Sequence, residues 1–278
     1  MFQGRQLLIV SKHQKEIVLK PLFEKMLQVT VIATANFDTD RFGTFSGEIE
    51  REGDALTTLR KKCSEAMAEY NTDLAVASEG SFGPHPSIPF LTADDELLIL
   101  IDKRNELEIT AREISTETNF SGKEIKTIDE LIDFANHVGF PSHGIILKSH
   151  ANHKEAPIKD CKNIDELIFA AKKYIRNEGM CFAETDMRAM NNPARMKVIE
   201  KAGKKLVKKL QSNCPSCGTP GYDVIKVNPG LPCGQCGFPT RSTLSQIFGC
   251  LKCDNIQTKF YPNSKEIEDP MYCDYCNP

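Results

Sequence analysis

The chain has 278 residues, of which 40% are hydrophobic and 26% charged, and its formal net charge is -3 at pH 7. This composition is typical of a globular protein with room for one large core or two smaller ones. The weak negative charge excludes a protein that attracts nucleic acid or anionic membrane over its whole surface, so any such binding must be local.

The N-terminal part alternates apolar strands with amphipathic helices, which predicts a βαβ organisation. The expected elements are a strand over residues 7–10, a helix over 14–27, a strand over 29–35, a helix over 50–70 and a strand over 73–78. No apolar run is long enough for a membrane span or a secretion signal. We therefore expect a cytoplasmic protein that makes no membrane contact.

The next part predicts a hairpin followed by two further strand and helix units. The hairpin covers residues 96–102 and 106–114, and it makes the expected sheet mixed. The later elements are helices over 128–138, 164–175 and 193–210 and strands over 144–148 and 180–184. The sequence thus predicts an α/β fold, a mixed sheet with flanking helices, over residues 1–211.

Residues 212–278 hold eight of the eleven cysteines, arranged as four CxxC pairs. The pairs are Cys214 and Cys217, Cys233 and Cys236, Cys250 and Cys253, and Cys273 and Cys276. Each CxxC turn aims two thiolates at one point, and two turns complete a tetrahedral site. The pattern predicts a zinc-ribbon module with two structural zinc ions.

The spacing of the CxxC pairs leaves their combination open. Successive pairs are separated by 15, 13 and 19 residues. Sequential pairing would join the first pair with the second and the third with the fourth. An interleaved cross-brace would join the first pair with the third instead.

Basic residues follow the first predicted strand directly. Lys12, His13 and Lys15 lie just after that strand and at the start of the next helix, where α/β sheets receive anions. We expect these side chains to bind phosphate oxygens. The alternative is a solvated helix start, because exposed lysine is common.

A second polar segment follows the strand over residues 73–78. Glu79 stands there among small residues, with Gly80 and Ser81 after it. A carboxylate at a strand end can hold Mg²⁺ while glycine lets a ligand approach the backbone. We expect Glu79 and Ser81 beside the ligand and Glu50, before the long helix, as a further acid. The alternative is a Gly/Pro-rich turn, with acids placed by the helix dipole.

The densest charged group outside the cysteine module lies between the last strand and the last helix. Its members are Glu184, Asp186, Arg188 and Arg195. We expect the acids to carry Mg²⁺ and orient water, and the arginines to neutralise charge that develops on a phosphate. The alternative is an asparagine N-cap before the helix and an internal ion pair of Asp186 with one arginine.

Two resemblances bear on function. The phrases SEGSFGPHP (residues 78–86) and ETDMRA (residues 184–189), with the paired knuckles, resemble an uncharacterised bacterial family, and this likeness implies no activity. Residues 7–83 resemble inosine/xanthosine triphosphate pyrophosphatases, with residues 11–15 in place of their phosphate loop. His13 stands where that family has asparagine, Lys15 lies one place early, and Glu79 stands where one branch has paired aspartates.

Two functions therefore stand as hypotheses. The first is an Mg²⁺-dependent hydrolase of a nucleotide or related phosphate ester. The second is a protein without catalysis that binds RNA or a protein partner through the ribbon and the lysine-rich helix 193–210. Residues 214–278 carry five Lys or Arg against six Asp or Glu, which gives the ribbon no strong electrostatic attraction to RNA.

Overall fold

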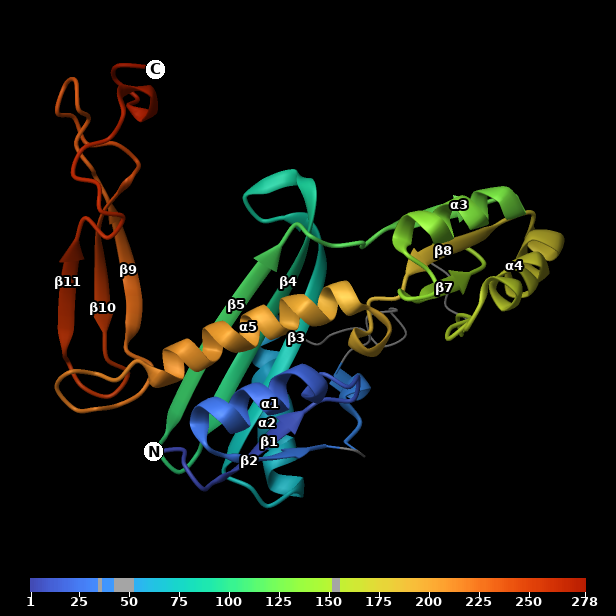
Figure 1. The fold of residues 1–278 in the computed structure, drawn as a ribbon, viewed down its shortest axis with the longest axis horizontal. Helices are drawn as coiled ribbons and strands as arrows, with labels where there is room; N and C mark the ends of the chain where they lie inside the picture. Colours follow the sequence, from blue (N-terminus) through green and yellow to red (C-terminus); the bar gives the residue numbers. More distant parts are fainter. Residues whose placement is uncertain (35–36, 43–52, 152–155) are drawn as a thin grey trace. The chain divides into compact units, whose positions relative to one another are not determined.

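The computed structural model describes residues 1–34, 37–42, 53–151 and 156–278 (Figure 1). These residues divide into two compact units, Met1–Val207 and Lys208–Pro278. Among them, no helix combines the length and the apolar character that a membrane crossing requires.

The first unit is built on a mixed five-stranded sheet in the order β2-β1-β3-β4-β5. Its strands are β1 (Gln6–Val10), β2 (Thr30–Ala33), β3 (Leu74–His85), β4 (Ile88–Asp102) and β5 (Leu107–Ser115). Strand β1 pairs in parallel with both β2 and β3, whereas β4 and β5 add antiparallel strands. The predicted α/β class with a mixed sheet is confirmed.

Helices cover both faces of this sheet because successive strand residues point to opposite sides. Helix α2 (Ala55–Glu69) packs its apolar stripe on Leu8 and Ala77 of one face. Helices α1 (Glu16–Leu27) and α5 (Pro193–Gln211) pack against each other closely. A Cβ at Gly203 of α5 would stand 2.7 Å from the Leu19 side chain of α1, so only glycine permits this approach.

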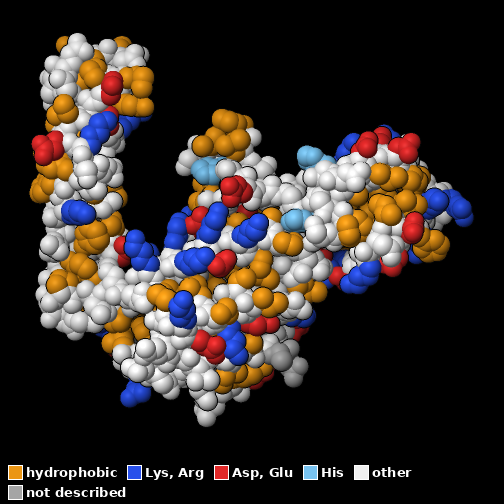
Figure 2. Space-filling model, viewed as in Figure 1, with side chains coloured by type: hydrophobic (Ala, Val, Ile, Leu, Met, Phe, Trp, Pro, Cys, Tyr) orange, Lys and Arg blue, Asp and Glu red, His pale blue; other side chains and the backbone are white. Residues whose placement is uncertain are grey.

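The strand predicted over residues 73–78 is longer than expected. Strand β3 continues to His85 and pairs with β4 along its length, so that Gly80 lies in the sheet opposite Glu96. The alternative of a Gly/Pro-rich turn after residue 78 is therefore wrong. The hairpin turns beyond His85, and Figure 2 shows hydrophobic side chains at its tip. Phe90 of β4 is 86% exposed.

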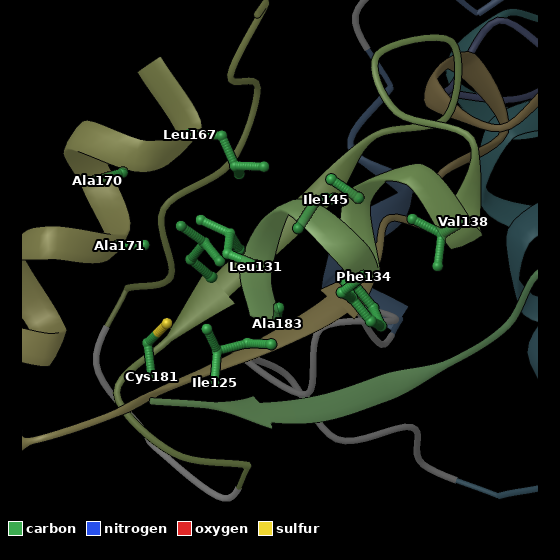
Figure 3. Close-up of a cluster of buried hydrophobic side chains, with 12 residues drawn as sticks. Ile125, Leu131, Phe134, Val138, Ile145, Leu167, Ala170, Ala171, Cys181 and Ala183 are labelled. Carbon is green, nitrogen blue, oxygen red and sulfur yellow. The ribbon is translucent and has the colours of Figure 1, made fainter. Parts of the chain in front are cut away.

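A smaller antiparallel sheet, β6-β8-β7, carries the two helices with the repeated IDEL start. Its elements are β6 (Gly122–Ile125), α3 (Ile128–Val138), β7 (Ile145–Lys148), α4 (Ile164–Glu178) and β8 (Cys181–Thr185). Thr127 and Asn163 cap the two helices, and each IDEL motif buries its leucine, Leu131 and Leu167, in one core (Figure 3). Within this small sheet and its two helices, only the short β6 lacked a prediction.

The second unit contains a three-stranded antiparallel sheet in the order β11-β10-β9. Its strands are β9 (Asp223–Pro229), β10 (Thr243–Gly249) and β11 (Ile256–Phe260). Few of its apolar side chains are buried, and no strand of the three has more than two buried residues. The cysteine clusters must therefore supply much of this unit's stability.

Candidate anion-binding site and metal centres

The eight cysteines of the CxxC pairs gather into two tetracysteine groups. One group contains Cys214, Cys217, Cys250 and Cys253, and the other contains Cys233, Cys236, Cys273 and Cys276. The arrangement is the interleaved cross-brace, and sequential pairing is wrong. The three antiparallel strands explain it, because the first and third pairs flank one end of the sheet and the second and fourth flank the other.

The sulfur distances fit zinc. Four Zn–S bonds of about 2.3 Å at tetrahedral angles place neighbouring sulfurs about 3.8 Å apart. The Sγ atoms of Cys214 and Cys253 lie 3.7 Å apart, and those of Cys233 and Cys276 lie 3.9 Å apart. These distances are far longer than the ~2 Å of a disulfide. The two groups can therefore hold two zinc ions, and neither leaves an open position for catalysis.

Local donors favour the thiolate form that zinc requires. The side chain of Thr219 lies 3.2 Å from Cys217 Sγ, and this hydrogen bond lowers the pKa of Cys217 to about 6. The backbone N–H of Lys252 donates to Cys250 Sγ at 3.3 Å. Such contacts from the turn backbone orient the ligands before metal binds.

A cavity of about 90 Å³ lies in the first unit where strand β1 ends. Strand β1 lies between β2 and β3, and the chain leaves it through α1 toward β2 and returns through α2 to β3. Connections that run in opposite directions from neighbouring parallel strands open a crevice at their carboxyl ends, where α/β proteins bind ligands. The cavity occupies this place.

Side chains from distant parts of the sequence converge on the cavity. Five Lys or Arg residues and one carboxylate are among those that line it. The cations are Lys12, Lys15, Lys62, Arg188 and Arg195, and the acid is Glu79. His13 lines it as well. The three segments singled out by the sequence therefore meet at one site.

Lys15 is the most deeply placed of the predicted phosphate ligands, at 8% exposed. Its Nζ donates to Ser78 Oγ at 2.8 Å and to the Ser78 carbonyl at 3.3 Å. Burial, and after it the nearby Arg195 guanidinium, lowers the pKa of Lys15 to about 8. Lys12 is more exposed and forms an ion pair with Asp38 at 2.9 Å.

Glu79 points to the α2 face of the sheet and is buried against a lysine of that helix. Lys62 Nζ forms a short ion pair with Glu79 Oε1, and both side chains are about nine-tenths buried. The carboxylate that was expected to bind Mg²⁺ thus forms an ion pair with Lys62. On the other face, Ser78 and Gly80 border the same cavity.

Arg195 enters the cavity from the first turn of α5. Its Nε donates to Glu96 Oε1 at 2.6 Å, and its Nη1 donates to the Met187 carbonyl. A Cβ at Gly80 would lie 2.5 Å from both Arg195 and Glu96, so glycine is required beneath this ion pair. Asp94, two residues before Glu96, is fully buried, and burial followed by the charge of Glu96 raises its pKa to about 8.

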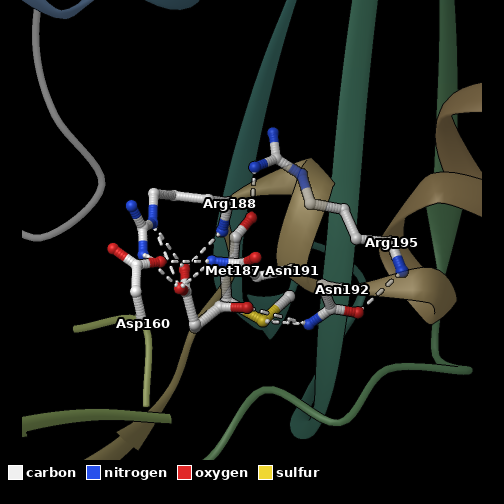
Figure 4. A network of polar contacts seen from close by, with 7 residues as sticks. Asp160, Met187, Arg188, Asn191, Asn192 and Arg195 are labelled. Carbon is white, nitrogen blue, oxygen red and sulfur yellow. Dashed lines mark hydrogen bonds and ion pairs between the residues drawn. The ribbon is translucent and has the colours of Figure 1, made fainter. Parts of the chain in front are cut away.

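A polar network fixes the segment between β8 and α5 (Figure 4). Asp186 is fully buried and accepts from the Arg188 backbone at 2.9 Å and from the Asn191 side chain at 2.8 Å. Arg188 Nη2 also bonds Asp160 and Asp186, both at 2.7 Å. Asn192 caps α5 by accepting from the Arg195 backbone at 2.9 Å. The cap and the internal ion pair, weighed as alternatives to a ligand site, are both present.

Several expected site residues lie away from the cavity lining. Asp186 forms an ion pair with Arg188 outside the lining. Glu184 forms an ion pair with Lys148 at 2.7 Å. Ser81 is exposed, on the opposite face of β3 from Ser78. Glu50 lies outside the described residues. Across the described part of the chain, the two cysteine groups are the only sets of three or more potential metal ligands. The assignment of Mg²⁺ to Glu79, Asp186 and Glu50 stays a prediction.

The lysine-rich face of α5 is largely neutralised. Lys201, Lys205 and Lys209 form ion pairs with Glu117, Glu113 and Asp223, and Figure 2 shows acidic side chains among the basic ones along this helix. Such exposed pairs are typical of a solvated face. The helix therefore offers RNA little uncompensated charge.

Sequence reasoning missed Lys62 and Phe82 in the lining. A signal existed for Lys62, because it stands three residues after Leu59 and four before Ala66, both on the buried stripe of α2. A lysine on such a stripe must find a buried partner. Phe82 carried no comparable signal; its ring lies 5.0 Å from the Arg195 guanidinium.

Comparison with known families gives one match. The model of a domain of unknown function, DUF6671, matches residues 62–278. The chain belongs to the DUF6671 family. No curated protein matches the chain.

The DUF6671 match covers all eight cysteines of the metal centres and most of the cavity. Lys62, Glu79, Arg188 and Arg195 lie inside it, whereas Lys12 and Lys15 precede it. The resemblance of residues 7–83 to the triphosphate pyrophosphatases stays a prediction.

Proposed function

We propose that this DUF6671 protein binds the phosphate group of a small phosphorylated compound in the cationic cavity and hydrolyses its ester bond. The convergence of five Lys or Arg side chains on one cavity at the strand crossover carries the proposal. A phosphoryl group in transfer bears negative charge on its oxygens, and fixed cations stabilise that charge.

The size of the cavity indicates which part of the compound enters it. Its volume of about 90 Å³ is well below the roughly 300–1,000 Å³ of pockets that enclose drug-sized ligands. The described residues thus enclose one anionic group, and the rest of the compound would lie outside. A nucleotide or a simple phosphate ester can meet this requirement through its terminal phosphate.

The side chains take distinct parts in this proposal. Lys12, His13 and Lys62 would bind the phosphate oxygens at the rim and wall of the cavity. Arg188 and Arg195 would neutralise the charge that develops as the ester bond breaks. Glu79, held by Lys62, leaves no described carboxylate for Mg²⁺, so we expect these cations to act without that metal.

The test uses zinc-loaded full-length protein. Inorganic phosphate is titrated by calorimetry, and phosphate release is measured over a panel of phosphate monoesters and nucleoside triphosphates, with and without added Mg²⁺. We expect phosphate binding and hydrolysis of at least one compound without Mg²⁺. Absence of phosphate release from every compound would refute the hydrolase, and absence of phosphate binding would refute the phosphate site as well.

Two arginine variants locate the activity. Arg188→Gln removes a cation of the cavity and should weaken phosphate binding and slow release. Arg60→Gln removes an exposed arginine that pairs with Glu108 at 2.5 Å on the surface, and it should change neither. Equal loss in the two variants would place the activity elsewhere.

Partner binding through the ribbon is a second proposal, favoured by apolar exposure in the second unit. Ile225, Phe260 and Tyr275 are 59%, 58% and 70% exposed. Apolar and aromatic side chains of this kind are typical of protein contacts more than of an electrostatic RNA surface. We expect RNA binding by the full chain to be weak at physiological salt; tight, salt-dependent binding would favour RNA instead. Such a protein would act in a reducing compartment such as the cytoplasm, where thiolates keep their zinc.

A further inference from the structure

Ser78 and Lys15 form a buried polar pair in the cavity. Ser78 is 5% exposed and Lys15 is 8% exposed, and both line the cavity. They come from different elements, because Ser78 lies in β3 and Lys15 precedes the first turn of α1. The Nζ and Oγ atoms are 2.8 Å apart, within hydrogen-bond reach.

We propose that Ser78 is the nucleophile of the hydrolase and that Lys15 is its general base. This inference rests on the proposed function and adds a covalent step to it. A serine hydroxyl becomes a useful nucleophile when a base within hydrogen-bond distance takes its proton, and a neutral lysine can serve as that base.

The reaction runs in two balanced steps. In the first, Ser78 Oγ forms a bond to phosphorus while the bond from phosphorus to the leaving oxygen breaks. The neutral Lys15 amine takes the Ser78 proton and then gives it to the leaving oxygen, which departs as an alcohol. In the second, water attacks the phosphoserine, Lys15 takes a proton from the water, and the departing Ser78 oxygen receives it. The products are the alcohol and inorganic phosphate.

The surroundings favour the neutral amine that this role requires. Burial, and then the Arg195 guanidinium, lowers the pKa of Lys15 to about 8. Lys62 acts in the same direction, while Glu96 and Glu79 oppose it. A base with a pKa close to the working pH is the most effective, because it is available in the neutral form and still accepts a proton readily.

The cavity also offers the charges that a phosphorylated serine needs. The Arg195 guanidinium lies against Gly80, two residues after Ser78 in β3. A Cβ at Gly80 would lie only 2.5 Å from its Nη2. Arg188 lines the cavity from the β8–α5 segment. Two guanidinium groups can hold the phosphoryl oxygens while Ser78 attacks.

A purely structural reading of the pair is that Ser78 satisfies a buried ammonium group. Lys15 donates to both the hydroxyl and the carbonyl of Ser78, which a buried lysine requires in any case. The two readings differ in the chemistry of Ser78, since only a nucleophile becomes phosphorylated during turnover.

The experiment uses zinc-loaded full-length protein and p-nitrophenyl phosphate, or the compound from the panel that the wild-type protein hydrolyses fastest. We expect acid quenching during turnover to trap phosphate on Ser78, identified by peptide mass spectrometry. Ser78→Ala should lower the rate by about 100-fold or more. Ser87→Ala, at an exposed serine between β3 and β4 that does not line the cavity, is the control and should keep the wild-type rate.

Lysine variants test the base. The wild-type rate should rise about tenfold per pH unit below pH 8 and level off above it, because the neutral amine is the active form. Lys15→Arg keeps the charge but cannot lose a proton, so the rate should fall and the rise toward pH 8 should disappear.

The outcomes separate the two proposals. Hydrolysis by the wild-type protein with no phosphoserine and an undiminished Ser78→Ala rate would overturn the nucleophile and leave the phosphate site standing. No hydrolysis of any compound would overturn the proposed function itself. If Ser78→Ala fails to fold, the trapped phosphoserine of the wild-type protein decides.

Discussion

Replacement of Arg195 by methionine should destabilise the first unit strongly, and by an amount that depends on pH. The Arg195 and Glu96 side chains are 6% and 0% exposed and lie 2.6 Å apart. Removal of one partner of a buried ion pair costs about 3–5 kcal/mol, because the remaining charge is left without compensation. Asp94, also fully buried, shares this site: burial and then the Glu96 charge raise its pKa, and the Arg195 charge lowers it.

The sign of the pH dependence follows from the proton on Asp94. Its folded-state pKa is raised to about 8 in wild type, above the roughly 3.9 of the unfolded chain, and loss of the Arg195 charge raises it further. The folded variant therefore keeps this proton above pH 8, where folded wild type gives it up. The stability of the variant should fall relative to wild type as the pH rises above about 8, by up to about 1.4 kcal/mol per pH unit.

Urea unfolding of zinc-loaded protein, followed by far-UV circular dichroism at pH 7 and pH 9, measures this difference. Adding Asp94→Asn to Arg195→Met should remove most of the pH dependence. Arg60→Met breaks the exposed pair with Glu108 and should cost less than about 1 kcal/mol at both pH values. An Arg195→Met cost below about 1 kcal/mol at pH 9, or one equal at both pH values, would refute the reasoning.

Three further changes test the metal centres and the packing. Cys217→Ser should leave one zinc per chain and make Cys250 reactive to alkylation while Cys233 stays protected; the reverse pattern would indicate sequential pairing. Gly80→Ala should cost about 1–3 kcal/mol because its Cβ meets the Arg195–Glu96 pair at 2.5 Å, and unchanged urea unfolding would contradict that contact. Phe134→Ala, at a 5% exposed core position, should cost about 3–5 kcal/mol in the same assay, and a loss below 1 kcal/mol would show that the core of the small sheet is loosely packed.

Local patterns predicted the elements well because they depend on neighbouring residues. The helix over residues 128–138 matches α3, since Thr127 and Glu130 form a capping box at its start. The pairing of strands depends on residues far apart in sequence. The separate sheet β6-β8-β7 therefore did not follow from the alternation, and the short β6 has only one buried residue, Ile125, to mark it.

The site was predicted in parts and not as a whole. The anion-binding position after β1 follows from the general behaviour of α/β sheets. The burial of the β4 acids could also have been predicted. Asp94 and Glu96 stand at every second position with Leu98 and Leu100, and so they share the buried face of the strand. The contact of Arg195 with Glu96 could not be predicted from the sequence. The two residues are 99 positions apart and meet only through the packing of α5.

The pairing of the cysteines was left open because three strands between them were not predicted. The four CxxC pairs were evident, yet the strands between them were not assigned. An antiparallel strand after each of the first three pairs reverses the chain each time, so alternate pairs must meet at the same end. Counting strands in the linkers DVIKVNP, TLSQIFG and IQTKF would have selected the cross-brace.

The placement of acids around the cavity argues for an anion as its ligand. Lys12 pairs with Asp38, and Arg188 and Arg195 pair with carboxylates that do not line the cavity. Each of these ion pairs keeps its cation charged and fixed in position without placing negative charge where a ligand would lie. An incoming phosphate would therefore meet cations that are already oriented and would displace no acid, whereas among the described lining residues a metal ion would meet a single carboxylate, which Lys62 already holds. This asymmetry supports the proposal that the cavity binds a phosphate group.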